Sequence, residues 1–168
     1  RSKYMGELFV KENVEKHLIC RAGWMMGGGP QKDKKFINKI IKQLKAGIKE
    51  LNIVNDKFGT PTYTHDFADN VKQLIKSDCW GLYNMVCKGQ TSRIEVSIEL
   101  LKILGLNNKI KINPVSSEHF KEEYSAPRPG SERLINKKLD LINLNTMRDW
   151  KVALKEYIFN YYSDFIDE

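Results

Sequence analysis

The amino-acid sequence predicts an α/β domain, because short apolar runs of strand length alternate with longer segments of helical periodicity over 168 residues. Hydrophobic residues make up 41% of the chain and charged residues 29%, which is the composition of a globular domain that can bury a core. The strand-like runs are too few and too widely spaced for an all-β fold. We therefore expect a single domain over residues 1–168, without internal repeats.

The first third of the chain predicts two helices, separated by a strand and a glycine-rich connection. Residues 2–14 place apolar side chains at helical spacing, and residues 17–22 form an apolar run of strand length. Residues 27–30 (Gly-Gly-Gly-Pro) predict a flexible connection, because they match neither the P-loop nor the dinucleotide-binding pattern. Asp33 is expected to cap the second helix, which Gly47 ends.

The rest of the chain continues this alternation. Strands are expected at residues 51–54, 80–86 and 110–112, and an extended loop at residues 58–63. Helices are expected at residues 66–77, 92–104 and 116–124, and from residue 147 onward. Ser92 and Glu95 predict a capping box for the second of these helices, whose buried face is expected to include Ile98. Residues 126–130 contain two prolines and are expected to be stiff and irregular.

The chain has a formal net charge of +7, which could favour the binding of nucleic acid, an anionic surface or an anionic small substrate. Its lysines are interleaved with acidic residues, and no nucleic-acid-binding motif is present. No apolar run approaches the ~20 residues that span a bilayer. Residues 1–9 lack the pattern of a signal peptide. We therefore expect neither a nucleic-acid partner nor a membrane partner.

The sequence contains three cysteines, Cys20, Cys79 and Cys87. An odd number of thiols without a Cys-x-x-Cys pair is typical of reduced cysteines, so we expect a cytoplasmic location. The three histidines stand apart from one another and from the cysteines, and no metal site is predicted. No Gly-x-Ser-x-Gly motif occurs. Composition and spacing by themselves therefore predict an α/β domain and no particular chemistry.

Four short motifs follow one another along the chain. They are residues 1–7 (Arg-Ser-Lys-Tyr-Met-Gly-Glu), 21–27 (Arg-Ala-Gly-Trp-Met-Met-Gly), 54–64 (Val-Asn-Asp-Lys-Phe-Gly-Thr-Pro-Thr-Tyr-Thr) and 126–138, where Ala-Pro-Arg-Pro precedes Ser131, Leu134 and Lys138. Residues 81–84 (Gly-Leu-Tyr-Asn) form a further motif between the third and the fourth. In this order, the motifs resemble those of the dTDP-4-dehydrorhamnose reductase family, a branch of the extended short-chain dehydrogenase/reductase superfamily.

The resemblance implies that this chain is the C-terminal substrate-binding lobe of such an enzyme, with the last elements of an incomplete Rossmann sheet. The N-terminal Rossmann cofactor domain would lie outside it. In the family, NADPH delivers hydride to the C4 ketone of a sugar nucleotide, converting dTDP-4-dehydrorhamnose to dTDP-L-rhamnose, while a Tyr donates the proton. A Lys four residues after that Tyr holds the nicotinamide ribose and lowers the pKa of the Tyr. Lys3 matches this catalytic and cofactor-binding Lys, whereas the Tyr would precede residue 1. We therefore expect this chain alone to be inactive.

The resemblance also implies a sugar site. Trp24 matches a Trp that contacts the deoxysugar, and an indole offers a flat apolar face and one N–H donor. Thr60, Thr62 and Tyr63 match a loop that faces the substrate pocket. A core Trp and a structural turn are the alternative interpretations of these residues.

Two arginines are candidate partners for the pyrophosphate of the substrate. A guanidinium can bind a phosphate through two hydrogen bonds, and two prolines flank Arg128. Arg133 is the second candidate, and a solvated surface arginine is the alternative. Ala22, Gly23 and Met26 depart from the Thr-Ser and Tyr of the family motif, which leaves the substrate open.

Two other functions stay open at this point. One is a non-catalytic regulatory or binding subunit with the same fold, and the other is an epimerase or reductase of UDP-linked 4-keto sugars. Some family members use Mg²⁺ at a dimer contact, although nothing in the sequence identifies its ligands. An apolar face that would otherwise contact the N-terminal cofactor domain could also drive formation of a homodimer.

Overall fold

The computed structural model describes residues 1–122 and 128–165. Its helices are α1 (Ser2–Asn13), α2 (Gly29–Lys32), α3 (Phe36–Lys45), α4 (Thr64–Lys76), α5 (Arg93–Ile103), α6 (Lys137–Leu141) and α7 (Trp150–Tyr162), with 3-10 turns η1 (Ser117–Phe120) and η2 (Ser163–Phe165). The strands are β1 (Leu18–Arg21), β2 (Trp24–Met26), β3 (Glu50–Val54), β4 (Phe58–Gly59), β5 (Pro61–Tyr63), β6 (Gly81–Asn84), β7 (Thr91–Ser92), β8 (Lys111–Val115) and β9 (Ser131–Glu132). The α/β class predicted from the sequence is confirmed.

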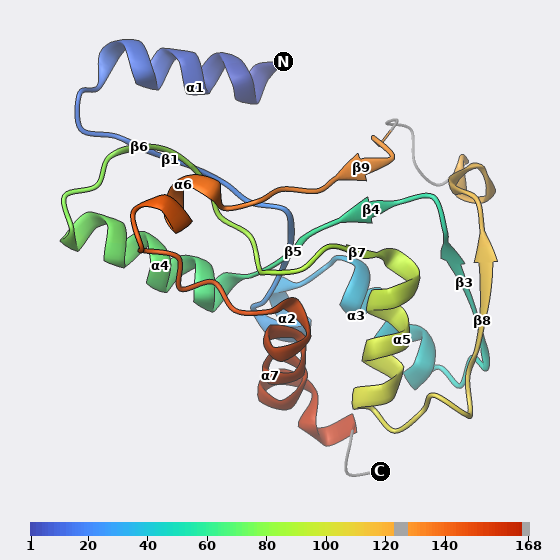
Figure 1. The fold of residues 1–168 in the computed structure, drawn as a ribbon. Helices are drawn as coiled ribbons and strands as arrows, with labels where there is room; N and C mark the ends of the chain where they lie inside the picture. Colours follow the sequence, from blue (N-terminus) through green and yellow to red (C-terminus); the bar gives the residue numbers. More distant parts are fainter. Residues whose placement is uncertain (123–127, 166–168) are drawn as a thin grey trace.

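The described strands form small separate sheets rather than one large sheet (Figure 1). Three of these sheets are parallel pairs, β1 with β6, β2 with β5, and β3 with β8. In the fourth sheet, β4 lies between β7, which is antiparallel to it, and β9, which is parallel to it. A parallel pair requires a crossover connection, and helices such as α3, α4 and α5 lie in these crossovers. The fold therefore brings residues from distant parts of the sequence side by side.

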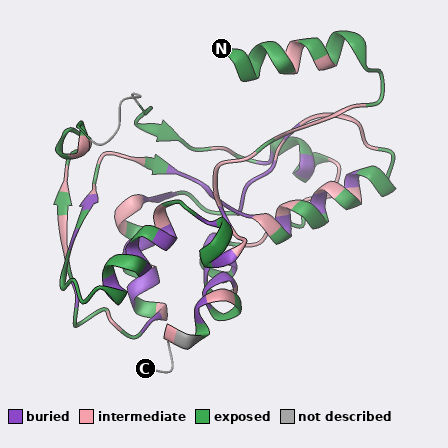
Figure 2. Ribbon diagram, turned by 180° about the vertical axis from the view of Figure 1, so that it is seen from behind, coloured by how far each residue is buried: buried purple, intermediate pink, exposed green. Residues whose placement is uncertain are grey.

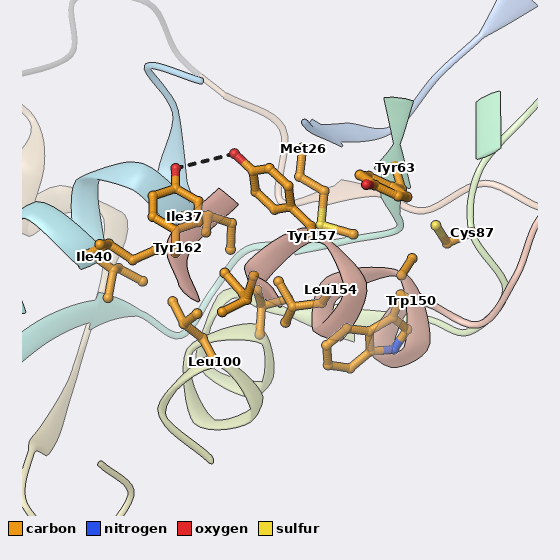
Figure 3. Close-up of a cluster of buried hydrophobic side chains, with 14 of the residues drawn as sticks. Met26, Ile37, Ile40, Tyr63, Cys87, Leu100, Trp150, Leu154, Tyr157 and Tyr162 are labelled. Carbon is orange, nitrogen blue, oxygen red and sulfur yellow. Dashed lines mark hydrogen bonds between the residues drawn. The ribbon is translucent and has the colours of Figure 1, made fainter. Parts of the chain in front are cut away.

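Helix α7 is the centre of the hydrophobic core (Figure 3). Ala153, Leu154, Tyr157 and Ile158 on this helix are fully buried. The hydroxyl group of Tyr157 donates a hydrogen bond of 2.8 Å to Asp33, which satisfies a polar group that burial would otherwise leave without a partner. The prediction of a C-terminal helix is therefore confirmed, although it begins at Trp150 rather than near residue 147.

Helix α1 projects away from the rest of the chain (Figures 1 and 2). The predicted helix forms, but none of its residues is buried. Tyr4, Met5 and Phe9 are 57%, 61% and 66% exposed, so its apolar side chains have no cover within the described residues. An ion pair between Glu7 and Arg21, with a hydrogen bond of 2.9 Å, connects the helix to β1.

Several predicted elements differ from the structure. Part of the glycine-rich connection is the short helix α2, because Gly28 and Gly29 adopt positive φ and Pro30 lies in its first turn. The N-cap of α3 is Lys35, and Asp33 accepts the backbone N–H of Lys35 and the hydroxyl of Tyr157 instead. The predicted role of Asp33 as a helix cap was therefore wrong.

Other differences lie further along the chain. The capping box of Ser92 and Glu95 is confirmed, but Ile98 on the same helix is 50% exposed rather than buried. The expected loop at residues 58–63 forms two short strands, β4 and β5. The expected helix at residues 116–124 is the 3-10 turn η1 in its described part. Residues 126 and 127 of the expected irregular stretch lie outside the described residues.

Candidate substrate site

The strand pair β2–β5 brings four of the predicted site residues together. Trp24 on β2 is in register with Pro61 on β5, and Met26 is in register with Tyr63. The backbone N–H of Trp24 donates to the carbonyl oxygen of Thr60 at 3.0 Å. Residues from motifs that are almost forty positions apart therefore share one small parallel sheet.

The two threonines use their hydroxyl groups inside the protein. Thr62 is fully buried, and its hydroxyl oxygen accepts the backbone N–H of Gly23 at 3.0 Å. Thr60 is 1% exposed, and its hydroxyl oxygen accepts the backbone N–H of Leu134 at 3.2 Å. The first bond holds β2 against β5, and the second holds the segment after β9 against β5. In this conformation both hydroxyls position backbone rather than face an open pocket.

Tyr63 is also buried, and it belongs to a row of aromatic rings. Its hydroxyl lies 3.3 Å from Nδ1 of His65, and Nε2 of the same His65 lies 3.1 Å from the hydroxyl of Tyr161. The Tyr63 and His65 rings are stacked with centroids 4.8 Å apart. Burial raises the pKa of Tyr63 above its ordinary value. The Tyr63 phenol is therefore neutral near pH 7 and can exchange hydrogen bonds with His65.

Trp24 has contacts on its edge and on both faces. Its indole N–H donates a hydrogen bond of 2.8 Å to the Glu132 carboxylate on β9. The guanidinium carbon of Arg93 lies 3.7 Å from the ring centroid, which is a close cation–π contact. A Cβ at Gly59 would collide with three neighbouring carbons of the indole. Because the two groups cannot share one face of the ring, the indole lies between Arg93 and Gly59. A sugar could reach a ring face only if Arg93 moved.

The sequence did not single out Arg93 or Glu132. Arg93 begins α5, directly after the Ser92 cap, and its guanidinium also lies 4.5 Å from the Phe36 ring centroid. The capping box was visible in the sequence, but the aromatic rings beside Arg93 come from residues 24 and 36. No local pattern could have predicted this contact, because the chain must fold before the three side chains meet.

The three-stranded sheet β7–β4–β9 carries further cations. Arg133 follows β9; its Nη1 donates to Gln90 at 3.1 Å, and its guanidinium carbon lies 5.6 Å from the Phe58 ring centroid. Lys57 precedes β4, and its ammonium donates to the backbone carbonyl of Arg128 at 2.9 Å. Arg128 is exposed. Both predicted phosphate partners therefore lie beside this sheet: Arg133 directly follows β9, and Arg128 precedes β9 by three residues.

Lys3 belongs to a different element from these residues. It is an exposed residue on α1, which contacts the rest of the chain through Glu7 and Arg21. The printed contacts therefore connect sugar and phosphate candidates with one another, and none of them involves Lys3.

Two cavities lie outside the Trp24 cluster. One, of about 340 Å³, is lined by His65, Asp66, Asp69, Thr146, Arg148 and Glu156. In it, Arg148 forms two hydrogen bonds of 3.0 and 3.1 Å from Nε to the nearly buried Asp66, and an ion pair with Glu156. The other, of about 380 Å³, lies between β6 and α6. The first cavity therefore contains an ion-pair network that connects α4 to α7.

Within residues 1–122 and 128–165, no group of three or more His, Cys, Asp or Glu side chains is arranged to hold a metal ion. The described residues therefore give no support for the Mg²⁺ considered from the sequence. In the same residues, no helix is both long enough and apolar enough to cross a membrane.

The fold and the site define a class of protein. Parallel strand pairs joined by helices, with aromatic and cationic side chains at the strand ends, are typical of a ligand-binding lobe of an α/β protein. Comparison with known families is more specific. The chain belongs to the family described as RmlD substrate binding domain, which matches residues 1–163. The resemblance stated from the four motifs is therefore confirmed.

Individual relatives agree with this assignment. The chain is 35% identical to a crystal structure of a dTDP-4-dehydrorhamnose reductase from Clostridium acetobutylicum, with a TM-score of 0.83 over 93% of this chain and 52% of that chain. It is 29% identical to the reductase from Bacillus anthracis in complex with NADP, with a TM-score of 0.84 over 95% of this chain and 54% of that chain. It is also 29% identical to the spore coat polysaccharide biosynthesis protein SpsK of Bacillus subtilis, over 94% of this chain and 52% of that protein.

The chain spans about half the length of the relatives it matches. More distant structures share the fold. A UDP-glucuronic acid 4-epimerase from Bacillus cereus is 19% identical and has a TM-score of 0.69 over 98% of this chain. The predicted fold, that of the C-terminal lobe of an extended short-chain dehydrogenase/reductase, is confirmed by these matches.

Proposed function

We propose that the protein containing this chain is an NADPH-dependent sugar-nucleotide 4-ketoreductase that converts dTDP-4-dehydrorhamnose to dTDP-L-rhamnose. This chain would supply its sugar-nucleotide site and, on its own, would be inactive. The observation that carries the proposal is the family match over residues 1–163. The cluster of Trp24, Arg93 and Arg133 supports it, because aromatic and cationic groups suit a sugar joined to a diphosphate.

NADP(H) is proposed as the cofactor because the Bacillus anthracis relative was solved in complex with NADP. When bound, NADPH supplies the hydride for the reduction of the ketone. Lys3 suits a role beside it, since its side chain is exposed on a helix that the described residues leave uncovered. Its ammonium would donate hydrogen bonds to the ribose hydroxyls, and its charge would favour the ionised form of a neighbouring tyrosine.

The substrate residues have distinct proposed roles. Arg128 and Arg133 would bind the pyrophosphate through charge-assisted hydrogen bonds. Trp24 would border the deoxysugar once Arg93 has moved from its ring face. Thr60 and Thr62 would act by holding β2, β5 and the segment after β9 in register, since their hydroxyl groups are bonded inside the protein. Tyr63 would act through His65, which its hydroxyl contacts.

We also propose a cellular location for the protein. All three cysteines are free thiols, which supports a reducing, cytoplasmic location. That residues 1–168 form one domain, and that the protein forms a homodimer, remain predictions.

The test is the NADPH-dependent reduction of dTDP-4-dehydrorhamnose by the full-length protein, followed at 340 nm as NADPH is oxidised. Wild-type protein should turn over, and Lys3→Ala should lower kcat/KM by roughly 10²–10⁴-fold, as expected for loss of a group that assists proton transfer. Lys11→Ala, on the same helix, is the matched control and should retain activity. Binding of dTDP-rhamnose without any turnover by wild type would instead favour the non-catalytic subunit, and a preference for UDP-linked 4-keto sugars would favour the alternative substrate class.

A further inference from the structure

The positive charge of the chain is concentrated in one segment, residues 31–49. This segment contains seven lysines and a single acidic residue, Asp33, so it carries +6 of the net charge of +7. The rest of the chain has 21 basic and 20 acidic residues and is nearly neutral. The interleaving of lysines with acidic residues therefore does not extend to this segment. We propose that residues 31–49 form a docking surface for an anionic phospholipid bilayer.

Folding places these charges on the surface of the protein. Asp33 is 5% exposed and accepts a hydrogen bond from the hydroxyl of Tyr157, so it does not offset the lysines at the surface. All seven lysines are exposed, and they lie on α2, on α3 and beside these helices: Lys32, Lys34, Lys35, Lys39, Lys42, Lys45 and Lys49. Five of them form no ion pair with any described residue, namely Lys32, Lys34, Lys35, Lys42 and Lys49.

Helix α3 turns its lysines away from the core. Its buried apolar stripe consists of Ile37, Ile40, Ile41 and Leu44. Because successive residues of an α-helix are rotated by about 100°, Lys35, Lys39 and Lys42 lie on the side opposite that stripe. Neither of the two cavities described above is lined by a residue of this segment. The lysines therefore project outward from a ridge instead of lining a pocket.

The chemistry of this ridge favours a lipid surface over a protein or a nucleic acid. Its cations are all lysines, whereas protein interfaces are enriched in arginine and depleted in lysine. Its one aromatic residue, Phe36, is half-buried with its ring beside Arg93, so the ridge offers no exposed ring on which a base could stack. Clusters of about 4–8 basic residues on an amphipathic helix are typical of contact with anionic lipids. A flat bilayer can also touch the whole length of a ridge, whereas a duplex curves away from it.

The contact is peripheral and electrostatic. The apolar stripe of α3 belongs to the hydrophobic core, so this helix cannot insert an apolar face between lipids. Binding should therefore be reversible and should weaken as salt screens the charges. The expectation of no membrane partner rested on the absence of a spanning run, and a surface contact of this kind needs none. The inference is independent of the proposed reductase function.

The test measures co-sedimentation of the full-length protein with large vesicles of phosphatidylcholine, either pure or containing about 30% phosphatidylglycerol. Wild type should bind the mixed vesicles at least 10-fold more tightly than the pure ones at about 50 mM NaCl, and most of this difference should disappear at about 300 mM. Equal binding to both kinds of vesicle, or binding that salt does not weaken, would overturn the proposal.

Two triple variants test whether this segment is responsible. Lys35→Gln, Lys42→Gln and Lys49→Gln together should weaken binding to the mixed vesicles at least 10-fold; Lys39 stays unchanged because it takes part in another interaction. The matched control neutralises three exposed lysines outside the segment and should change binding less than 2-fold: Lys72→Gln, Lys76→Gln and Lys109→Gln. Both variants remove the same net charge, so equal losses would show that total charge, and not this surface, drives the binding.

Competition decides between the classes of anionic partner. A duplex DNA of about 20 base pairs and poly-glutamate are titrated against the mixed vesicles at the same salt concentration. Weaker binding of both polymers would support the lipid surface. Tighter binding of the DNA would assign the ridge to nucleic acid, and tighter binding of poly-glutamate would assign it to an acidic protein; either result would overturn the proposal.

Discussion

Single residues in the candidate site act mainly by holding backbone in place. Thr62 is an example, because its buried hydroxyl accepts the N–H of Gly23 and joins two strands that are 35 or more positions apart in the chain. The sequence predicted that this threonine belongs to the site, and the contact it makes there is internal. Its contribution should therefore appear in stability as well as in binding.

Thr62→Val replaces the hydroxyl with a methyl group of similar size and leaves the half-buried N–H of Gly23 without this acceptor. We expect the free energy of unfolding to fall by about 1–3 kcal/mol, the usual cost of an unsatisfied buried polar group. Urea unfolding followed by circular dichroism would measure it. Thr146→Val is the matched control, because Thr146 is exposed and should change stability by less than about 0.5 kcal/mol. Equal effects of the two substitutions would contradict the role of this hydrogen bond.

Gly59 is required for a different reason. Its φ is not in the left-handed region, but a Cβ there would collide with the Trp24 indole. We expect Gly59→Ala to displace the indole and to destabilise the protein by about 1–3 kcal/mol through overpacking. Thermal unfolding and Trp fluorescence would report both changes. Gly6→Ala is the control: its Cβ would meet nothing within 4 Å, and it should stabilise α1 slightly.

At the level of elements, the capping box of α5 connects helix stability to the site, since Arg93 is the first residue of that helix. The Glu95 carboxylate accepts the backbone N–H of Ser92, and this bond is the largest cause that lowers the pKa of Glu95 below its ordinary value of 4.5. Because the folded-state pKa is the lower one, the stabilisation is fully present above the unfolded-state pKa. It is lost as the pH falls through the folded-state pKa.

We therefore expect the stability difference between wild type and Glu95→Gln to depend on pH. Glutamine can still complete a capping box, but it does not titrate. Wild type should be the more stable protein at pH 7, and the difference should shrink as the pH falls below about 4.5, the ordinary value for Glu. Urea midpoints measured between pH 3 and pH 7 would test this. A difference that stays constant over that range would show that the carboxylate charge has no role in the cap.

At the scale of the whole molecule, the packing decides which thiols can react. Cys87 is buried, and desolvation raises its pKa to about 12. Thiolate is the reactive form, so Cys87 should resist iodoacetamide at pH 8 in the folded protein and react once urea unfolds it. Cys79 is partly exposed and serves as the internal control. Peptide mass spectrometry would identify the labelled sites, and rapid labelling of Cys87 in the native protein would contradict this description of the core.

The packing of the described residues also leaves apolar side chains of helix α1 exposed. Helix α1 forms as its periodicity predicts, but Tyr4, Met5 and Phe9 remain exposed among the described residues. The relatives that the chain matches are about twice as long. The apolar side chains of α1 are therefore available for contact with further residues of a longer protein.

The sequence by itself determined the elements whose signals are local. Helical periodicity predicted α1, α3, α4 and α5, the Ser92 and Glu95 pair predicted a helix start, and four ordered motifs predicted the family. These features depend on residues a few positions apart, so they can be recognised before the chain is folded.

Only the tertiary structure decided what the site residues touch. Asp33 was expected to cap a helix, but Tyr157, which lies 124 positions away, donates a hydrogen bond to it. Arg93 was not expected in the site at all, and it meets Trp24 because the β2–β5 and β7–β4–β9 sheets bring residues 24, 59, 93 and 132 together. The physical reason is that parallel strand pairs join segments separated by long crossovers, so their side-chain contacts have no local pattern in the sequence.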